Sequence, residues 1–237
     1  MAKPVGFDQK LLLHQLDYTA IQSKQYQRSE MYDVLDGYMR NDIKGAKSRK
    51  NAITMLMKIW YLLDDELLPI RDEILKEFHQ FTEEERLFVH WGLTCVAYPF
   101  FRDIANEFGR HFQLQEEVSS KTILKRIKDL YGDKRRVEVG TSAVLTTMKS
   151  WGVIVPTEKT FYKENDKIQI TNSLLQTFLI KVLLKSLGNK ALYIDLVENH
   201  PIFFPFQYNL NLFELREREE FSFYYEGLNN LVVEKAE

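Results

Sequence analysis

The sequence has one cysteine, Cys95, so no disulfide bond can form within the chain. A lone thiol fits a reducing compartment, and the first residues, MAKPVGFDQK, lack the apolar segment of a secretory signal. Both features predict a cytoplasmic protein. Ten glycines and six prolines leave little material for long loops. No stretch approaches the roughly 18 uncharged apolar residues of a membrane span, so we expect no membrane partner.

Signatures of catalysis and of cofactor binding are equally scarce. The five histidines do not pair at a spacing of three or four residues, so no helix is expected to present a metal-binding face. The sequence has no Gly-rich phosphate loop, no GxSxG and no HExxH. The acidic runs 64–66 and 83–85 are typical of charge at helix ends, although paired carboxylates also serve in general acid–base catalysis. We therefore predict no enzymatic activity, cofactor, metal or small-molecule substrate.

The sequence does contain enough apolar material for a packed core. Hydrophobic residues make up 45% and aromatic residues 13% of the 237 residues, which is typical of a folded protein with one large or two small domains. Helical spacing of apolar residues dominates, so we predict a mainly α fold with small β elements. We expect a helical N-terminal region at 1–82, a winged helix-turn-helix at 83–188, and a helix with a β element at 189–237.

The segment 120–173 carries the pattern of a winged helix-turn-helix. Apolar residues recur at intervals of three and four from Ile123 to Tyr131, which predicts an amphipathic helix that Gly132 ends. The basic turn 134–136 follows and leads into a second helix. In a winged helix-turn-helix, this second helix is the one offered to the DNA major groove.

The second helix is expected to begin with Thr141 or Ser142 as its N-cap and to end at Gly152. Its outward side is short, polar and free of acidic residues, which suits approach to base edges and phosphates. It has no Arg, Asn or Gln for a bidentate base contact, so we expect phosphate contacts to dominate. The outward residues are Ser142, Thr146, Lys149 and Ser150. Short strands are then expected at 153–155, 160–163 and 168–170, with turns at 156–159 and 164–167.

Positive charge gathers around this segment. Positions 121–136 hold seven Lys or Arg against two Asp, a local net charge of +5 in a chain whose formal net charge is −2. A basic patch on a nearly neutral protein favours contact with phosphates, so double-stranded DNA is the expected partner. The same patch is compatible with a solvated helix face in a protein-docking module. The candidate DNA contacts are Lys121, Lys125, Lys134, Arg135, Arg136, Thr141, Ser142, Thr146, Lys149, Lys159 and Lys163.

A second basic helix start lies near the N-terminus. The polar turn 40–49 leads into an apolar helix expected at 48–63, with Ser48 as its N-cap. This arrangement resembles a weaker helix-turn-helix. Its candidate DNA contacts are Lys47, Ser48, Arg49 and Lys50. Because the helix is apolar most of the way round, a plain core helix is the favoured alternative.

The remaining elements follow from apolar spacing, capping residues and turn residues. Residues 1–10 are expected to form a loose arm. A capping box at Thr82–Glu85 opens a long apolar helix, which Pro99 should kink or break. Further helices are expected at 11–25, 69–78, 100–112, 173–187 and 191–198, and a short helix or turn is expected at 31–39. Strands are expected at 209–215, 221–225 and 231–233, and the apolar segment 200–206 is expected as a loop packed against the core.

Several runs together resemble a known family. ERLFVHWGLTCVAYPFFRDIANEFGRHF (85–112) precedes a basic helix, and TSAVLTTMKSWGVI (141–154) follows it. With a short ribbon, the late His200-Pro201 and the early GAKSRKNAI (45–53), the order resembles the BrxA family of bacterial BREX phage-defence systems. The resemblance covers about residues 40–210. It implies a small, cytoplasmic, non-enzymatic DNA-binding component of a phage-restriction system.

Three functions are compatible with the sequence. The first is a DNA-binding protein in phage defence, whose affinity falls steeply with salt because phosphate contacts dominate. The second is a structural adaptor that docks other subunits of a defence complex. Its exposed aromatic surface would comprise Phe203, Phe204, Phe206, Tyr224 and Tyr225. The third is a transcriptional regulator that senses a ligand. The acidic stretch 214–220 is not expected to touch DNA.

Overall fold

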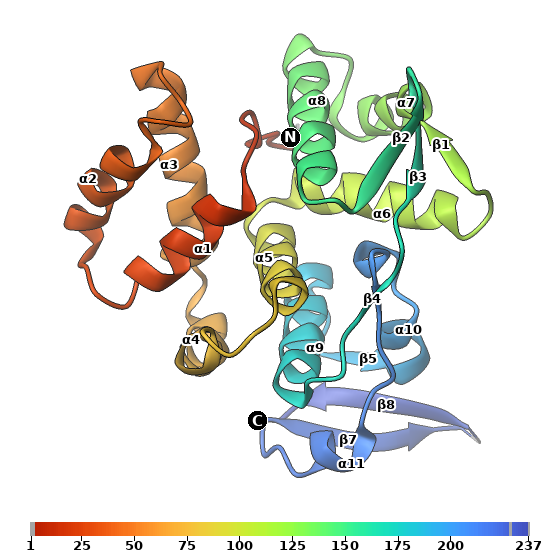
Figure 1. The fold of residues 1–237 in the computed structure, drawn as a ribbon. Helices are drawn as coiled ribbons and strands as arrows, with labels where there is room; N and C mark the ends of the chain where they lie inside the picture. Colours follow the sequence, from red (N-terminus) through yellow and green to blue (C-terminus); the bar gives the residue numbers. More distant parts are fainter. Residues whose placement is uncertain (1–2, 228, 237) are drawn as a thin grey trace.

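The computed structural model describes residues 3–227 and 229–236, and this part of the chain is mainly helical with three small sheets (Figure 1). The predicted fold class is confirmed. The α-helices are α1 (Leu13–Gln22), α2 (Arg28–Met39), α3 (Ala46–Trp60), α4 (Leu68–Glu77), α5 (Glu83–Ala97), α6 (Pro99–Phe112), α7 (Ser120–Tyr131), α8 (Arg135–Ser150), α9 (Ser173–Leu187), α10 (Ile194–Glu198) and α11 (Leu212–Arg216). The 3-10 helices are η1 (Asp65–Leu67) and η2 (Pro201–Phe203). The strands are β1 (Glu117–Ser119), β2 (Ile154–Glu158), β3 (Phe161–Glu164), β4 (Ile168–Gln169), β5 (Ala191–Tyr193), β6 (Phe206–Gln207), β7 (Phe221–Glu226) and β8 (Asn230–Lys235).

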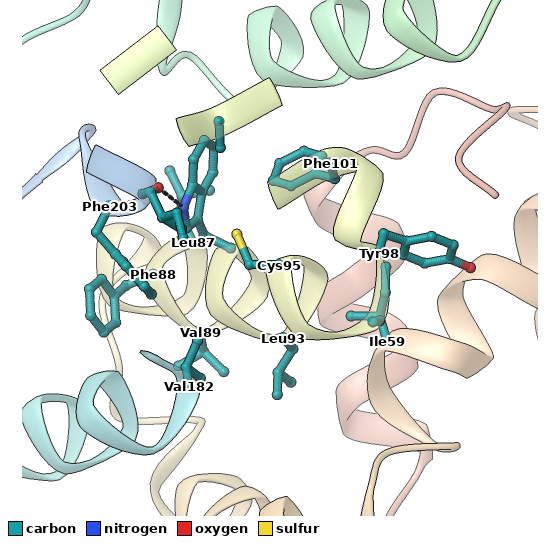
Figure 2. Close-up of a cluster of buried hydrophobic side chains, with 14 of the residues drawn as sticks. Ile59, Leu87, Phe88, Val89, Leu93, Cys95, Tyr98, Phe101, Val182 and Phe203 are labelled. Atoms are coloured by element: carbon teal, nitrogen blue, oxygen red, sulfur yellow. Dashed lines mark hydrogen bonds between the residues drawn. The ribbon is translucent and has the colours of Figure 1, made fainter. Parts of the chain in front are cut away.

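Helix α5 forms the centre of the core. It packs against α1, α3, α6 and α9, which explains why its sequence is apolar on almost every side. Figure 2 shows its side chains among Ile59 of α3, Phe101 of α6, Val182 of α9 and Phe203 of η2. Cys95 lies in the same core, where burial raises the pKa of its thiol. One hydrophobic core runs through all three expected regions, and the boundaries at 82/83 and 188/189 stay a prediction.

Local sequence sets both ends of α5. The Thr82 hydroxyl accepts a hydrogen bond from the backbone N–H of Glu85 at 3.1 Å. The Glu85 carboxylate accepts one from the backbone N–H of Thr82 at 3.0 Å, which completes the predicted capping box. The helix ends at Ala97, and Pro99 becomes the first residue of α6, where its missing N–H costs no helical hydrogen bond. The expected break at Pro99 is confirmed.

The segment from α6 to β3 has the element order of a winged helix-turn-helix: helix, strand, helix, helix and a two-stranded wing. The strands pair antiparallel in the order β1-β3-β2 (Figure 1). We call this segment, residues 99–164, the winged unit. The sequence did not predict β1, which is only three residues long. Strand β4, expected to extend the ribbon, instead pairs in parallel with β6.

Helix α8 begins seven or eight residues earlier than expected. Lys134 is its N-cap, so Arg135 and Arg136 form its first turn and not a preceding loop. The prediction that Thr141 or Ser142 caps this helix is wrong, because both lie in its interior. The predicted turn 156–159 is also shorter than expected, since β2 continues to Glu158.

Residues 3–11, which we call the N-terminal arm, pack against the protein, contrary to the loose arm expected at 1–10, of which residues 1 and 2 lie outside the described part of the chain. Val5, Phe7 and Leu11 are buried. The Leu11 N–H donates to the Thr147 hydroxyl at 3.2 Å, and the Leu11 carbonyl accepts from the Trp151 indole N–H at 3.0 Å. The arm therefore joins α1 directly to the inner side of α8.

The N-terminal helices α1, α2 and α3 pack on one another and on α5. They confirm the helices expected near 11–25, 31–39 and 48–63, and α4 confirms the one near 69–78. Gly45 is the N-cap of α3, so the prediction of Ser48 as the cap is wrong. Ser48 instead lies within the first turn of the helix.

The C-terminal region forms the sheet β5-β8-β7 beside α9, α10 and α11. The hairpin β7-β8 confirms the strands expected near 221–225 and 231–233. The segment 200–206 packs into the core as predicted, through Ile202, Phe203, Phe204 and Phe206. The strand expected at 209–215 is wrong: that segment contains α11. The helix expected at 191–198 is shorter, because its first three residues form β5.

No helix within the described residues has the length and apolar character needed to cross a membrane.

Candidate nucleic-acid interface

The outward face of α8 is the main candidate site. Arg135, Val139, Ser142, Thr146 and Lys149 follow one another at intervals of three or four, so they share one side of the helix. Arg135, Val139, Ser142 and Lys149 are exposed and Thr146 is half-buried. The opposite side packs into the core. It comprises Val137, Gly140, Thr141, Val144, Leu145, Thr147 and Met148.

The prediction of Thr141 as a DNA contact is therefore wrong. Thr141 is only 2% exposed and lies on the side of α8 that faces the core. The adjacent Gly140 lies so close to the arm that an added Cβ would be 2.6 Å from the Val5 side chain. Thr146 remains on the outward face, although its hydroxyl donates to the Ser142 carbonyl at 2.8 Å. Because the hydroxyl proton is used in this bond, Thr146 can present only its methyl group and its oxygen lone pairs to a partner.

The predicted basic residues around α8 are all exposed. Lys134, Arg135 and Arg136 lie at the start of the helix and Lys149 near its end, with the Lys149 ammonium 6.0 Å from the centre of the Tyr162 ring in β3. The wing adds Lys159 at its tip and Lys163 on β3. Helix α7 adds Lys121 and Lys125, which line a shallow hollow together with Lys128, Asp129 and Asp133. The fold thus brings the cations of separate sequence segments onto one winged unit.

A small ion-pair network ties α7 to the start of α8. The Lys128 ammonium lies 2.7 Å from a carboxylate oxygen of Asp133 and 2.7 Å from one of Glu138. Arg135 contacts the other carboxylate oxygen of Glu138 at 3.4 Å. The hydrogen bonds that the Lys128 ammonium donates to Asp133 and Glu138 raise the pKa of Lys128, and the one to Glu138 lowers the pKa of that carboxyl. Glu138 and Val139 were not predicted as site residues, because the helix was expected to begin after them.

The basic start of α3 is only partly available to a partner. Lys47 and Lys50 are exposed and Ser48 is half-buried. Arg49, by contrast, contacts the Asp36 carboxylate at 2.6 Å and donates to the Ile43 carbonyl at 2.9 Å. The hydrogen bond that Arg49 donates to Asp36, with a second from Arg40, lowers the pKa of the Asp36 carboxyl. The prediction of Arg49 as a phosphate contact is corrected, because its guanidinium joins α3 to α2 and to the turn between them.

Farther along α3, the outward side continues with Thr54 and Lys58, which are exposed. The Lys58 ammonium sits 4.5 Å from the centre of the Tyr98 ring, and partial burial lowers its pKa. Lys47, Lys50 and Lys58 thus give α3 a basic outward side of its own, weaker than that of α8.

Among residues 3–227 and 229–236, no three His, Cys, Asp or Glu side chains gather as a metal site. His90 is buried, accepts from the Trp60 indole N–H at 3.1 Å and contacts Asp17 at 2.9 Å. These bonds link α1, α3 and α5, so His90 is part of the core.

The aromatic surface expected for an adaptor is smaller than predicted. Phe203, Phe204 and Phe206 are buried, which corrects their expected exposure. Tyr224 and Tyr225 are 44% and 64% exposed on β7.

Among known proteins, no family model, no curated protein and no solved structure matches this chain.

Proposed function

We propose that this protein binds double-stranded DNA through the winged unit, with α8 in the major groove. The observation that carries the proposal is the outward face of α8. It holds cations at both ends, Arg135 and Lys149, and small polar or apolar side chains between them. Glu138 is the only acidic residue of α8, and it is paired with Lys128. A helix of this kind, carried between a second helix and a wing, is the form that winged helices present to a duplex.

Phosphate contacts supply most of the affinity in this proposal. The candidate contacts among the exposed cations of the winged unit lie on α7, in or next to α8, and in the wing. They are Lys121, Lys125, Lys134, Arg135, Arg136, Lys149, Lys159 and Lys163. Each phosphate that a cation neutralises releases counterions, so affinity falls steeply as salt rises. Lys47 and Lys50 of α3 provide a second, weaker region of phosphate contact.

The test is fluorescence anisotropy with a labelled duplex of about 25 base pairs at several salt concentrations between 50 and 200 mM. The wild type should bind with a steep negative dependence of log K on log salt. Reversing Lys134, Arg135 and Arg136 to Glu should weaken binding and flatten the slope by about 2 to 3, because each lost contact removes about 0.9.

A matched control separates local contact from total charge. Arg28, Lys76 and Lys190 are also exposed but lie outside the winged unit. Reversing these three to Glu changes the net charge by the same amount and should leave the slope close to that of the wild type. Equal effects of the two triple variants, or no binding by the wild type at low salt, would refute the proposal.

A structural adaptor is the second candidate, and the C-terminal sheet favours it. Tyr224 and Tyr225 on β7 are exposed, and Phe213 of α11 is 76% exposed. Exposed aromatic side chains of this kind are common where proteins dock. Co-purification of a protein neighbour that is lost in Phe213→Ser and Tyr225→Ser, with no nucleic acid present, would support this function over DNA binding.

A role in phage defence rests on the resemblance to the BrxA family. That resemblance lies in the runs 85–112 and 141–154 and in the segment around His200-Pro201. A DNA-binding component fits such a system because restriction acts on incoming DNA. The adjacent genes provide the test: a DNA methyltransferase and a large ATPase support the role, and their absence speaks against it.

A further inference from the structure

The early start of α8 changes which residues are able to reach bases. Arg135 belongs to the first turn of the helix, seven or eight residues before the start expected from sequence. In DNA-binding helix-turn-helix proteins, the N-terminal residues of this helix contact base edges. Arg135 also lies on the outward face of α8, in line with Val139, Ser142 and Thr146. Its side chain is 87% exposed, so it is free to enter a groove.

Arg135 is the last member of a series of ion pairs that begins with Lys128 on α7. Asp133 and Glu138 both contact the Lys128 ammonium at 2.7 Å, and the second carboxylate oxygen of Glu138 contacts Arg135 at 3.4 Å. Lys128 therefore anchors Glu138, and Glu138 in turn orients the Arg135 guanidinium. A carboxylate is otherwise unfavourable on a surface that faces phosphates, because like charges repel. Holding a guanidinium in place gives Glu138 a physical reason to be there.

We propose that Arg135 recognises guanine in the major groove and that Glu138 is its positioning residue. This inference rests on the proposed function. Guanine presents two acceptors in the major groove, O6 and N7, at a spacing that the two parallel N–H groups of a guanidinium match. Lysine carries the same charge but lacks this fork, so it does not replace arginine at a bidentate site. The outward face of α8 then specifies sequence as well as contacting phosphates.

The experiment begins by selecting duplexes from a random pool with the wild-type protein. The selected sequences should contain a guanine whose replacement by another base weakens binding about 5- to 150-fold, as expected for one bidentate contact. Replacing that guanine by 7-deazaguanine removes the N7 acceptor and should also weaken binding. The readout is the ratio of affinities for the two duplexes, measured at one salt concentration.

Three variants locate the effect. Arg135→Lys keeps the charge and should bring the ratio for guanine over 7-deazaguanine close to one, with affinity for unselected DNA largely kept. Arg126→Lys, a matched control at an exposed arginine of α7 outside the candidate contacts, should leave the ratio unchanged. Glu138→Gln should lower the ratio while it raises affinity for unselected DNA, because a negative charge is removed. A Glu138 that served only to join α7 to α8 would change stability and leave the ratio alone.

The results that would overturn this inference differ from those that would overturn the proposed function. A wild type that binds duplexes with no preferred guanine, or an Arg135→Lys variant with an unchanged ratio, overturns this inference and leaves DNA binding standing. A wild type that binds no duplex at low salt overturns the proposed function and this inference with it.

Discussion

Lowering the pH should destabilise the folded protein at the place where η2 packs on α6. The group responsible is His200, the N-cap of η2. Its Nδ1 accepts a hydrogen bond from the Ile202 N–H at 3.2 Å, so the neutral ring is required at that nitrogen. The residue is 9% exposed, and burial, with Arg102 and Arg110 nearby, lowers the pKa of His200 from 6.5 to about 4. Protonation therefore favours the unfolded chain, in which the imidazole is free to accept a proton.

The sign and size of the effect follow from proton linkage. Between pH 6.5 and 4 the unfolded state binds more protons at this residue, so stability falls as the pH falls. From pH 7 to pH 5 the loss from His200 is about 2 kcal/mol, since each pH unit below 6.5 contributes about 1.4 kcal/mol. Burial also lowers the pKa of His90, which adds to the loss in the same direction.

The assay is urea unfolding followed by tryptophan fluorescence at pH 7 and pH 5. His200→Asn keeps an oxygen able to accept from the Ile202 N–H but does not titrate in this range. Its loss between pH 7 and pH 5 should be smaller than that of the wild type by about 2 kcal/mol. His79→Asn, at an exposed position after α4, should behave as the wild type does. An equal loss in His200→Asn and the wild type would refute this explanation.

Two further changes test packing and capping. Gly109→Ala should destabilise the protein by about 1 to 3 kcal/mol, because the new Cβ would overlap the Pro201 carbonyl oxygen. Gly37→Ala, where nothing lies within 4 Å, should stabilise it by about 0.5 to 1 kcal/mol through helix propensity. Urea midpoints of the two variants should move in opposite directions. Thr82→Ala removes the cap of α5 and should cost about 1 kcal/mol, seen as a melting temperature lower by about 2 to 4 °C. An unchanged melting temperature would show that the capping box does not contribute.

The winged unit was predictable because its helices are amphipathic and its order is simple. The boundary of α8 was not, and Gly140 is the reason. In sequence, a basic run followed by a glycine and two hydroxyl residues is typical of a turn that leads to an N-cap. In the structure, Gly140 lies inside the helix, where a Cβ would be 2.6 Å from the Val5 side chain and 3.0 Å from the Phe7 carbonyl oxygen. The residue marks a tertiary contact that sequence spacing does not reveal.

The N-terminal arm was missed for the same physical reason. Val5, Phe7 and Leu11 are too few and too unevenly spaced to predict an element, and their burial comes from partners more than 90 residues away in the chain. The prediction for Arg49 was wrong because a contact within the fold already uses its charge. Its charge and position suggested phosphate contact, yet Asp36, 13 residues earlier, lies 2.6 Å from it. The sequence shows where cations lie along the chain, but only the fold shows which of them are already paired.

The most direct measurement of the central claim is lysine footprinting: modification with an amine-reactive ester, with and without a duplex, followed by mass spectrometry. DNA should protect Lys134 and Lys149 of α8 and Lys159 and Lys163 of the wing. Two exposed lysines outside the winged unit, Lys76 and Lys190, should react as before. Protection confined to lysines outside the winged unit, with those around α8 unchanged in a duplex-bound sample, would contradict the account.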